Sequence, residues 1–308
     1  MFIDKYNLGR KELVKTPLRK TFFIKNADGK IRPSWRFWKW FSVISIHLFF
    51  FLSFFLDIQF LEGTLNASRF LGFHMIDPYT SLEVFMVHHE LGINMIIGTA
   101  TIVIVYLLIG GRTYCGWVCP YSILADIAEC LHRKLIDKKI INVRPYSKLY
   151  SNKIKYVFWA LFLVLAAISG YIIFESISVV GIMSRAIVYG WSVALIWVLV
   201  VFLFDVFVSS RAWCTYICPV GTTYAALGWA SATKIQWNDN CDHCMACSGV
   251  CPEPHILELT KAKYAKGRAE KGIKTEHVLS GDCTMCGRCI DVCHSDALGY
   301  NFRLTDLL

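Results

Sequence analysis

The 308-residue sequence predicts two parts, a helical bundle that crosses a membrane and a small α+β domain rich in cysteine. Three observations predict this fold class. Long apolar stretches occupy the first two thirds of the chain, a cysteine motif occurs twice at a fixed offset, and two tight runs of cysteines lie near the C-terminus. We expect a basic extension over 1–35, a membrane domain over 36–232 and the cysteine-rich domain over 233–308.

Uncharged apolar stretches that are long enough to cross a bilayer, or nearly so, predict an all-α four-helix transmembrane bundle. They are Phe41–Leu56, Leu91–Gly111, Tyr156–Phe174 and Ala186–Phe204. The first reaches spanning length only if it continues past Asp57 to about Phe60. Trp35, Trp38 and Trp40 at its start are typical of an interfacial aromatic belt. So many apolar stretches in a chain of this size favour a membrane bundle over the buried helices of a soluble core.

The distribution of Lys and Arg predicts the orientation of the bundle. Their number is 11 in residues 1–40, 1 in 61–92, 9 in 111–155, 1 in 175–185 and 10 in 209–308. Because basic residues collect on the cytoplasmic side, we expect a multi-pass protein of the inner membrane with both termini in the cytoplasm. The net charge of +9 then fits helix ends beside anionic lipid, and no nucleic-acid partner is implied. The polar N-terminus shows no secretory signal, so the cysteines are expected in a reducing compartment.

A repeated motif ends each predicted helical hairpin. Arg112–Pro120 and Arg211–Pro219 both have the form Arg-x2-Cys-x3-Cys-Pro, and their residues differ in number by 99. Two hairpins repeated in the same direction are related by an axis along the membrane normal, so the four cysteines are expected near one another. These cysteines are Cys115, Cys119, Cys214 and Cys218. They would hold a further metal cluster, form a redox-active pair, or lie as structural neighbours of other clusters. Cys130 has no counterpart at Trp229 and is expected to be an inert packed thiol.

The two cysteine runs, which start at Cys241 and Cys283, both have the spacing Cys-x2-Cys-x2-Cys-x3-Cys. This spacing is that of bacterial-type 2[4Fe–4S] ferredoxins, in which each run supplies three ligands to one cluster and its last cysteine to the other. The crossed assignment gives one cluster to Cys241, Cys244, Cys247 and Cys293, and the other to Cys283, Cys286, Cys289 and Cys251. Zinc sites usually pair two separated Cys-x2-Cys knuckles, so iron–sulfur clusters are favoured. The protein is therefore expected to carry single electrons.

These spans, motifs and runs together resemble the NapH family of membrane ferredoxin-type subunits, with NosH and the C-terminal part of NosR as relatives. The resemblance covers roughly Arg36 to the C-terminus. It implies a quinol dehydrogenase subunit that oxidises menaquinol or ubiquinol and passes electrons to an iron–sulfur or haem partner of a periplasmic nitrate or nitrous-oxide reductase system. The sequence departs from the pattern where His294 follows Cys293 in place of proline, and in its long basic N-terminal extension.

Quinol oxidation requires an apolar slot and a nearby base, and ionisable residues in or beside the spans are candidates. The candidates are His47, Asp57, His88, His89, Glu90 and Glu175, with Asp205 in the fourth span and His74, Asp77 and Glu83 in the first predicted periplasmic loop. The loop histidines would equally serve as hydrated loop residues. Lysines and arginines between the two runs would attract an acidic redox partner, or lie as a solvated loop near lipid.

Two other functions remain open from the sequence. One is an assembly or metal-reducing accessory factor, as in relatives that mature copper oxidases; these carry an extra C-terminal domain, whereas this chain ends fifteen residues after Cys293. The other is a redox scaffold without its own quinone site. Reduction of the clusters by a quinol would distinguish the quinol dehydrogenase subunit from the redox scaffold.

Overall fold

The computed structural model describes residues 2–4, 22–25, 31–56, 61–70, 72–90, 92–140, 153–264 and 272–303. The chain forms two compact units. The cysteine-rich unit comprises Met1–Phe41, Leu107–Trp117 and Leu227–Leu308, and the helical unit comprises Ser42–Tyr106 and Val118–Ala226. Each unit is built from separated segments of the chain, so the three consecutive domains expected from the sequence stay a prediction.

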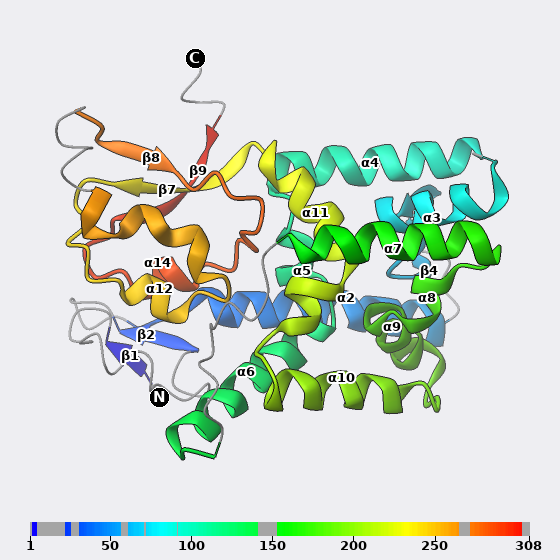
Figure 1. Ribbon diagram of the computed structural model, residues 1–308, viewed down its shortest axis with the longest axis horizontal. Coiled ribbons are helices and arrows are strands. Elements are labelled where there is room, and N and C mark those ends of the chain that lie inside the picture. Colours follow the sequence, from blue (N-terminus) through cyan, green and yellow to red (C-terminus); the bar gives the residue numbers. More distant parts are fainter. Residues whose placement is uncertain are drawn as a thin grey trace. The chain divides into compact units, whose positions relative to one another are not determined.

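The helical unit consists mainly of apolar helices. They are α2 (Trp35–Phe55), α3 (Pro78–His88), α4 (Ile93–Ile109), α6 (Tyr121–Asp137), α7 (Ile154–Ser169), α8 (Ile173–Ile177), α9 (Val179–Tyr189), α10 (Leu195–Phe207), the π-helix η2 (Trp213–Ile217) and α11 (Pro219–Trp229), of which α2, α4 and α11 continue into the other unit. Within the unit α10 packs against α6 and α9, and α3 packs against α7 (Figure 1). In the described part of the chain, α2 alone is long and apolar enough to cross a membrane by length and composition, whereas α4, α7, α9 and α10 are apolar but shorter.

The helix boundaries differ from the predicted spans. The expectation of one helix over Ala186–Phe204 is wrong, because α9 ends at Tyr189 and α10 begins at Leu195. Gly190 between them has φ of 92°, a conformation that favours glycine and ends the helix. The third predicted span is shortened in the same way, since α7 ends at Ser169 and the next residue, Gly170, has φ of 68°.

A three-stranded antiparallel sheet interrupts the helical pattern between α2 and α3. Its strands are β4 (Leu61–Thr64), β5 (Ala67–Phe70) and β6 (Phe73–Ile76), and β5 lies in the middle. The expectation of an all-α membrane part is therefore wrong for this segment. Gly63 has φ of 93°, and an added Cβ there would overlap the carbonyl oxygen of Ala67, so the tight turn between β4 and β5 requires glycine.

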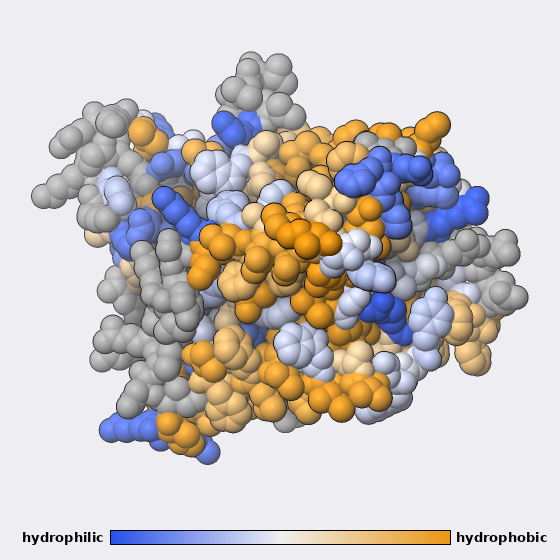
Figure 2. Space-filling model, turned by 45° about the vertical axis from the view of Figure 1, so that its right-hand side comes forward, coloured by the Kyte–Doolittle hydropathy of each residue, from blue (hydrophilic) through white to orange (hydrophobic). Residues whose placement is uncertain are grey.

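Large apolar side chains remain exposed along α2, α4, α7 and α10. Among the most exposed are Phe55, Ile93 and Ile168, at 72%, 74% and 79%. Figure 2 shows broad hydrophobic areas on the surface of the protein. Because monomeric soluble proteins rarely expose such large apolar surfaces, these helix faces are suited to an apolar surrounding.

The cysteine-rich unit contains an antiparallel sheet in which β7 (Thr233–Asn238) lies between β8 (Thr275–His277) and β9 (Leu298–Phe302) (Figure 1). The helices beside it are short: α5 (Thr113–Trp117), α12 (Ala246–Val250), η3 (Pro254–Thr260), η4 (Ala262–Tyr264) and α14 (Arg288–Val292). A second sheet holds β1 (Phe2–Asp4), β2 (Phe23–Lys25) and β3 (Ile31–Pro33). Ile235, Trp237, Leu257, Val278 and Leu298 form a core together with cysteines of both runs. Residues 233–303 thus have the predicted α+β structure.

Candidate iron–sulfur and thiol sites

Both cysteine runs have the same local structure. In each, a loop with two cysteines leads through a left-handed residue, Met245 (φ 60°) or Gly287 (φ 70°), into a one-turn helix that carries the third cysteine. The fourth cysteine, Cys251 or Cys293, caps the end of that helix in an extended conformation. The left-handed residue reverses the chain, so that thiols from a short segment are able to converge.

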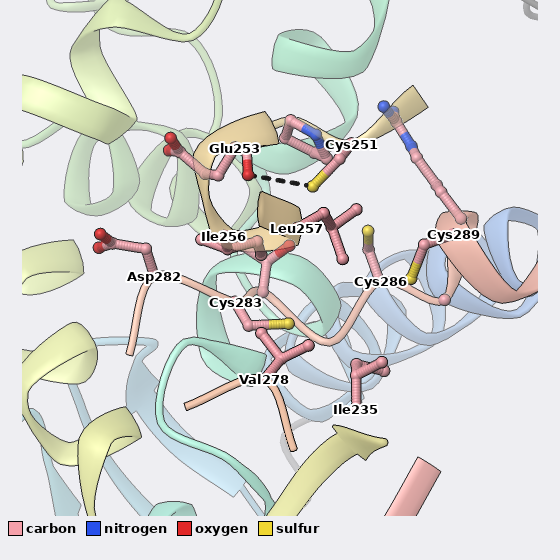
Figure 3. A pocket seen from close by; sticks show the side chains of 14 residues that line it. Ile235, Cys251, Glu253, Ile256, Leu257, Val278, Asp282, Cys283, Cys286 and Cys289 are labelled. Carbon is pink, nitrogen blue, oxygen red and sulfur yellow. Dashed lines mark hydrogen bonds between the residues drawn. The ribbon is translucent and has the colours of Figure 1, made fainter. Parts of the chain in front are cut away.

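Four thiols that the crossed assignment groups together line one cavity. These are Cys251, Cys283, Cys286 and Cys289, which we call the second thiol set (Figure 3). Apolar side chains close the cavity, including Ile235, Leu257 and Val278. Burial raises the pKa of Cys251 well above its usual value, and nearby Cys286 and Cys283 raise it further. The last thiol of the first run therefore lies with the three leading thiols of the second run.

The remaining cysteines of the runs, Cys241, Cys244, Cys247 and Cys293, form the first thiol set. Burial raises the pKa of Cys247 to about 11, with further contributions from the nearby Cys241 and Cys293. Burial also raises the pKa of Cys244, to which nearby Cys293 adds. Charges act on one another strongly only at short range, so these thiols lie close together. Cys293 Sγ also accepts a hydrogen bond from the Ala297 amide at 3.2 Å.

The two thiol sets fit [4Fe–4S] clusters by their donor chemistry. Each set offers four sulfur donors around one site, which is the ligand set such a cluster takes. The buried thiols resist ionisation on their own, as the raised pKa of Cys283, about 12 because of burial, shows. Iron ions would compensate the negative charge of the thiolates in this apolar environment. Amide groups such as that of Ala297 are suited to bind the sulfurs and thereby tune the cluster.

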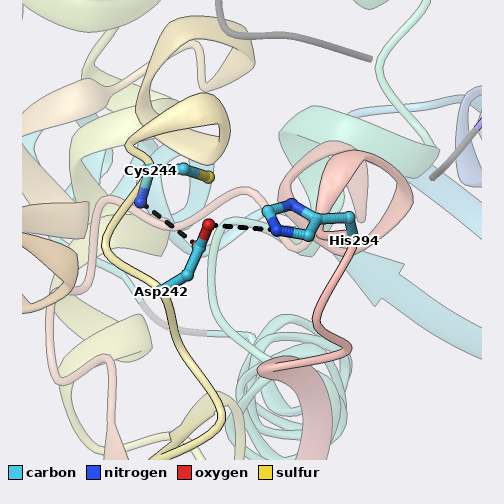
Figure 4. Close-up of side chains that lie close together, drawn as sticks. All are labelled: Asp242, Cys244 and His294. Carbon is cyan, nitrogen blue, oxygen red and sulfur yellow. Dashed lines mark hydrogen bonds and ion pairs between the residues drawn. The ribbon is translucent and has the colours of Figure 1, made fainter. Parts of the chain in front are cut away.

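His294, which replaces the expected proline, links the two runs. Its Nε2 lies 3.0 Å from Asp242 Oδ2, and Asp242 Oδ1 accepts a hydrogen bond from the Cys244 amide at 3.2 Å (Figure 4). Ligand atoms of these three residues lie within 4.8 Å of one another, a spacing that suits a metal ion. Because Cys244 belongs to the first thiol set, we interpret the Asp242–His294 pair as a clasp beside that set. It joins the start of one run to the end of the other, which proline would not do.

The two Cys-x3-Cys-Pro motifs adopt related but unequal structures. Cys115 lies in α5, and Cys214 lies in the π-helix η2. Cys119 and Cys218 are buried, and each precedes a proline at the start of the next helix. Burial raises the pKa of Cys214, as do Asp205, Cys119 and Cys218 nearby. The structure thus brings three of the four thiols together within the helical unit. Cys115 belongs to the cysteine-rich unit, so its place in the quartet stays a prediction.

A buried polar network surrounds the second motif, and Asp205 is the member of it that the sequence analysis named as a candidate. The Arg211 guanidinium forms ion pairs with Asp126 and Glu129 of α6. The hydroxyl group of Tyr121 donates to Asp205 at 2.7 Å, and Asp205 also accepts a bond from the Trp213 amide. The acidic residues of α6 stand three positions apart in an otherwise amphipathic helix, which is a weak signal that they share one face. This network fixes η2, and with it Cys214, against α6.

The candidate proton-handling residues lie in different environments. His47 is buried in α2, with Nδ1 2.7 Å from the carbonyl oxygen of Val43. Glu175 pairs with Arg185 and accepts a hydrogen bond from Asn66. His88, His89 and Glu90 are exposed at the end of α3, and Asp57 lies outside the described residues.

Glu83 and Asp77 are more deeply placed than those candidates. Glu83 is fully buried and accepts a hydrogen bond from the Phe174 amide at 2.7 Å, while its Oε2 atom is buried without a hydrogen-bond partner among the described residues. Asp77 is 4% exposed and caps α3. Burial raises the pKa of the Tyr79 hydroxyl group, and the nearby Glu83, Cys218 and Asp77 raise it further. The sequence analysis named both acids as candidates in a predicted loop but not their burial, because the partner of Glu83 lies in α8, far along the chain.

Comparison with known proteins agrees with this geometry. The sequence model of a family described as "4Fe-4S binding domain" matches twice, over residues 91–139 and 189–238, and that of a "4Fe-4S dicluster domain" matches residues 240–297. The double match confirms the predicted repeat. No solved structure matches the chain.

Three relatives extend the likeness over most of the chain. Ferredoxin-type protein NapH of Haemophilus influenzae is 33% identical over 270 residues, which are 87% of this chain and 89% of that protein. NapH of Escherichia coli is 33% identical over 87% of this chain and 91% of that protein. Methylamine utilization ferredoxin-type protein MauN of Paracoccus denitrificans is 34% identical over 72% of this chain and 74% of that protein.

The two thiol sets and the matching domains define an iron–sulfur electron-transfer protein of the ferredoxin type. The extent of the similarity to NapH shows its family more closely. The chain belongs to the NapH family of ferredoxin-type proteins.

Proposed function

We propose that this protein is a membrane-bound subunit that oxidises menaquinol or ubiquinol and passes the electrons, through two [4Fe–4S] clusters, to an iron–sulfur or haem partner of a respiratory reductase system. The observation that carries the proposal is the combination of two separate four-thiol sites with helices that expose apolar faces. Electron carriers of this kind need a membrane-soluble donor, and quinol is the donor that apolar helices are able to reach.

The apolar faces of α2, α4, α7 and α10 support a four-helix transmembrane bundle with both termini in the cytoplasm. Helices of 13 to 17 residues are short for a hydrocarbon core of about 30 Å, so flanking apolar residues would complete the shorter spans. Trp191 and Val193, exposed at 96% and 82% just before α10, are such residues. An apolar surrounding would make their exposure favourable.

The proposed ligands are the first thiol set for one cluster and the second thiol set for the other. The motif cysteines Cys119, Cys214 and Cys218 lie together and would hold a further metal site or act as redox-active thiols. The match of the "4Fe-4S binding domain" to both motif segments supports the former. Glu83 and Asp77, buried near Tyr79, are the proposed acceptors of the two protons that quinol releases, in preference to the exposed His88, His89 and Glu90.

The relatives fall into two groups with different names. NapH gives its name to the family, and the MauN proteins are named for methylamine utilization. We propose a periplasmic reductase for nitrate or nitrous oxide as the system served, reached through partner subunits, because the identity to NapH covers the larger share of the chain.

The test is quinol-driven bleaching of the clusters in purified protein reconstituted anaerobically in nanodiscs. We expect about eight irons per chain from the two thiol sets, with any iron at the motif cysteines in addition, and a menaquinol analogue should reduce the iron–sulfur absorbance. Cys119→Ser and Cys218→Ser should abolish this reduction while dithionite still reduces the clusters and the iron content stays near eight. Cys130→Ser, which removes a thiol outside the motifs, is the matched control.

Three results would contradict the proposal. Zinc in place of iron would exclude electron transfer by these sites. Reduction by dithionite but never by a quinol would favour a redox scaffold. Full quinol-driven reduction in both motif variants would make the motif cysteines structural.

A further inference from the structure

The loop Gly281–Gly287, which carries Cys283 and Cys286 of the second thiol set, is held by the first motif segment. Gly116 of α5 lies so close that an added Cβ would be 2.7 Å from the carbonyl oxygen of Thr284. The indole N–H of Trp117 donates to the carbonyl oxygen of Met285 at 2.9 Å. The segment that bears Cys115 is therefore packed directly on the ligand loop of one thiol set.

Arg112 links this segment to the two stretches of the chain that supply the thiols of the second thiol set. Its guanidinium nitrogen Nη1 lies 3.5 Å from Glu253 Oε1 and 3.4 Å from Asp282 Oδ1, and the side chain is 4% exposed. Glu253 follows Cys251 by two residues, and Asp282 directly precedes Cys283. Both acids line the same cavity as the four thiols (Figure 3). The cation is thus buried at the edge of this cavity.

Aromatic side chains complete the contact on the same loop. The Tyr300 hydroxyl donates to the Met285 carbonyl at 2.7 Å, and the Trp35 ring lies 4.8 Å from that of Tyr300 and 6.2 Å from that of Trp117. Gly287 allows this approach, since an added Cβ would overlap the ring of Trp35. The start of α2 and the α5 segment therefore enclose the second thiol set together.

The first thiol set lies nearer to solvent. Cys241, Cys244 and Cys293 are partly exposed, and Asp242 beside them is exposed. In the second thiol set, Cys251, Cys286 and Cys289 are buried. The two sets thus differ in access, with one covered by α2 and α5 and the other accessible to a soluble partner.

We infer that electrons enter the ferredoxin domain at the second thiol set, from the α5 segment, and leave it at the first thiol set. Arg112 is a positioning residue in this route. It fixes the entry point and sets the affinity of the group at the second thiol set for an electron. This inference rests on the proposed function, in which a quinol is the reductant. The quinol loses two electrons and two protons; the protons stay on the quinol side. Each transfer oxidises the donor by one electron and adds one electron to the group held by the second thiol set, without forming or breaking a bond of the chain.

The charge of Arg112 determines the direction of the expected effect. A buried cation stabilises additional negative charge nearby, so it favours the reduced state of a group held by Cys251 and Cys283. Without the guanidinium, the carboxylates of Glu253 and Asp282 would keep their contacts with His255 but lose the permanent positive charge between them, and their negative charge would oppose reduction of that group. Removal of either carboxylate should act in the opposite sense.

The experiment is a potentiometric EPR titration of the full-length, iron-loaded protein with dithionite and redox mediators. In Arg112→Gln, the reduced-to-oxidised ratio of one cluster at a fixed potential should fall about tenfold, equivalent to about 59 mV for one electron, while the other cluster titrates unchanged. Asp282→Asn should shift the same cluster in the opposite direction. Arg112→Lys, which keeps the charge, should restore most of the wild-type ratio.

Ligand variants identify which signal is affected. Cys289→Ser should alter the signal that Arg112→Gln shifts, and Cys244→Ser should alter the other. Lys274→Gln removes an exposed charge of the same unit and is the matched control, with no shift expected.

Equal shifts of both clusters, no shift, or a shift confined to the cluster marked by Cys244→Ser would overturn the inference. If Arg112→Gln does not retain its iron, the Asp282→Asn variant is the deciding test. An upward shift in the reduction potential of the cluster identified by Cys289→Ser supports the inference, and the absence of this shift overturns it. The titration uses no quinol, so a failure of quinol oxidation would contradict the proposed function without affecting this result.

Discussion

At the scale of single residues, Asp77 combines a structural and an electrostatic role. Its carboxylate accepts hydrogen bonds from the Tyr79 and Thr80 amides at the start of α3, at 3.0 and 3.1 Å. Burial raises its pKa from 3.8 to about 6, although these hydrogen bonds lower it in part. The helix cap is therefore retained at an electrostatic cost that depends on pH.

The direction of that pH dependence follows from linkage. Because the folded state holds the proton more tightly than the unfolded state, the stability contributed by Asp77 is fully present below about pH 4 and is lost as pH rises through about 6. A difference of about two pKa units corresponds to about 3 kcal/mol. Asp77→Asn keeps a capping acceptor without the charge, so it should be more stable than the wild type at pH 7.5, with a much smaller difference at pH 4.5.

Thermal unfolding in detergent at these two pH values measures the effect. Ser178→Ala is the matched control, because Ser178 is a buried cap of α9 that does not ionise. It should cost about 1 kcal/mol equally at both pH values. A difference between Asp77→Asn and wild type that does not change with pH would contradict the assignment.

The residue scale also shows what the sequence was able to predict about the site. The spacing typical of two-cluster ferredoxins predicted the grouping of Cys251 with Cys283, Cys286 and Cys289, and these four thiols line one cavity, while their role as cluster ligands stays a prediction. Arg112 was not predicted as functional, and Glu83 was named only as one of several candidates in a predicted loop, since their partners lie far along the chain: Asp282 is 170 residues from Arg112, and Phe174 is 91 residues from Glu83. Single-sequence patterns contain no information about such contacts.

At the scale of elements, the repeat was predictable but its asymmetry was not. The two motifs share residue spacing, yet the first forms an α-helical turn and the second a π-helix. Apolar composition likewise located the helices, but averaging across Gly190 merged α9 with α10. The sheet β4–β6 was missed because its strands are only four residues long and follow an apolar helix. Tertiary packing therefore decides what each local pattern becomes.

Gly116 gives a direct test of this asymmetry. Its counterpart 99 residues later is Thr215, so the second motif accepts a side chain at a position where the first has none. In the first motif the Thr284 carbonyl oxygen occupies the space that a methyl group would need. Gly116→Ala should therefore displace α5 from the ligand loop, weaken the Trp117–Met285 hydrogen bond and destabilise the cysteine-rich unit by about 1–3 kcal/mol.

Chemical denaturation of the iron-loaded protein, followed by cluster absorbance, measures this loss. Thr215→Ala, the equivalent change in the second motif, should leave cluster release nearly unaffected. Equal stability of Gly116→Ala and wild type would show that α5 does not need close contact with Thr284.

At the scale of the whole molecule, charge and apolar surface make one joint prediction about topology. If the apolar faces of α2, α4, α7 and α10 lie in lipid, the Lys and Arg counts predict that residues 1–40, 111–155 and 209–308 lie on the cytoplasmic side. Both thiol sets would be cytoplasmic, whereas the reductases implied by the family resemblance are periplasmic. A complete electron path would thus need a further carrier or partner subunits on both faces of the membrane.

Reporter fusions in cells test this topology. A reporter that is active only in the cytoplasm should be active after Leu308 and after Ile140, and one active only in the periplasm should be active after Glu90, in the predicted outer loop before α4. Replacing Lys138 and Lys139 with glutamine weakens the positive charge of the central loop and should reduce the fraction with this orientation. Periplasmic activity after Leu308 would reverse the charge argument, place both thiol sets beside periplasmic acceptors and remove the need for a second carrier.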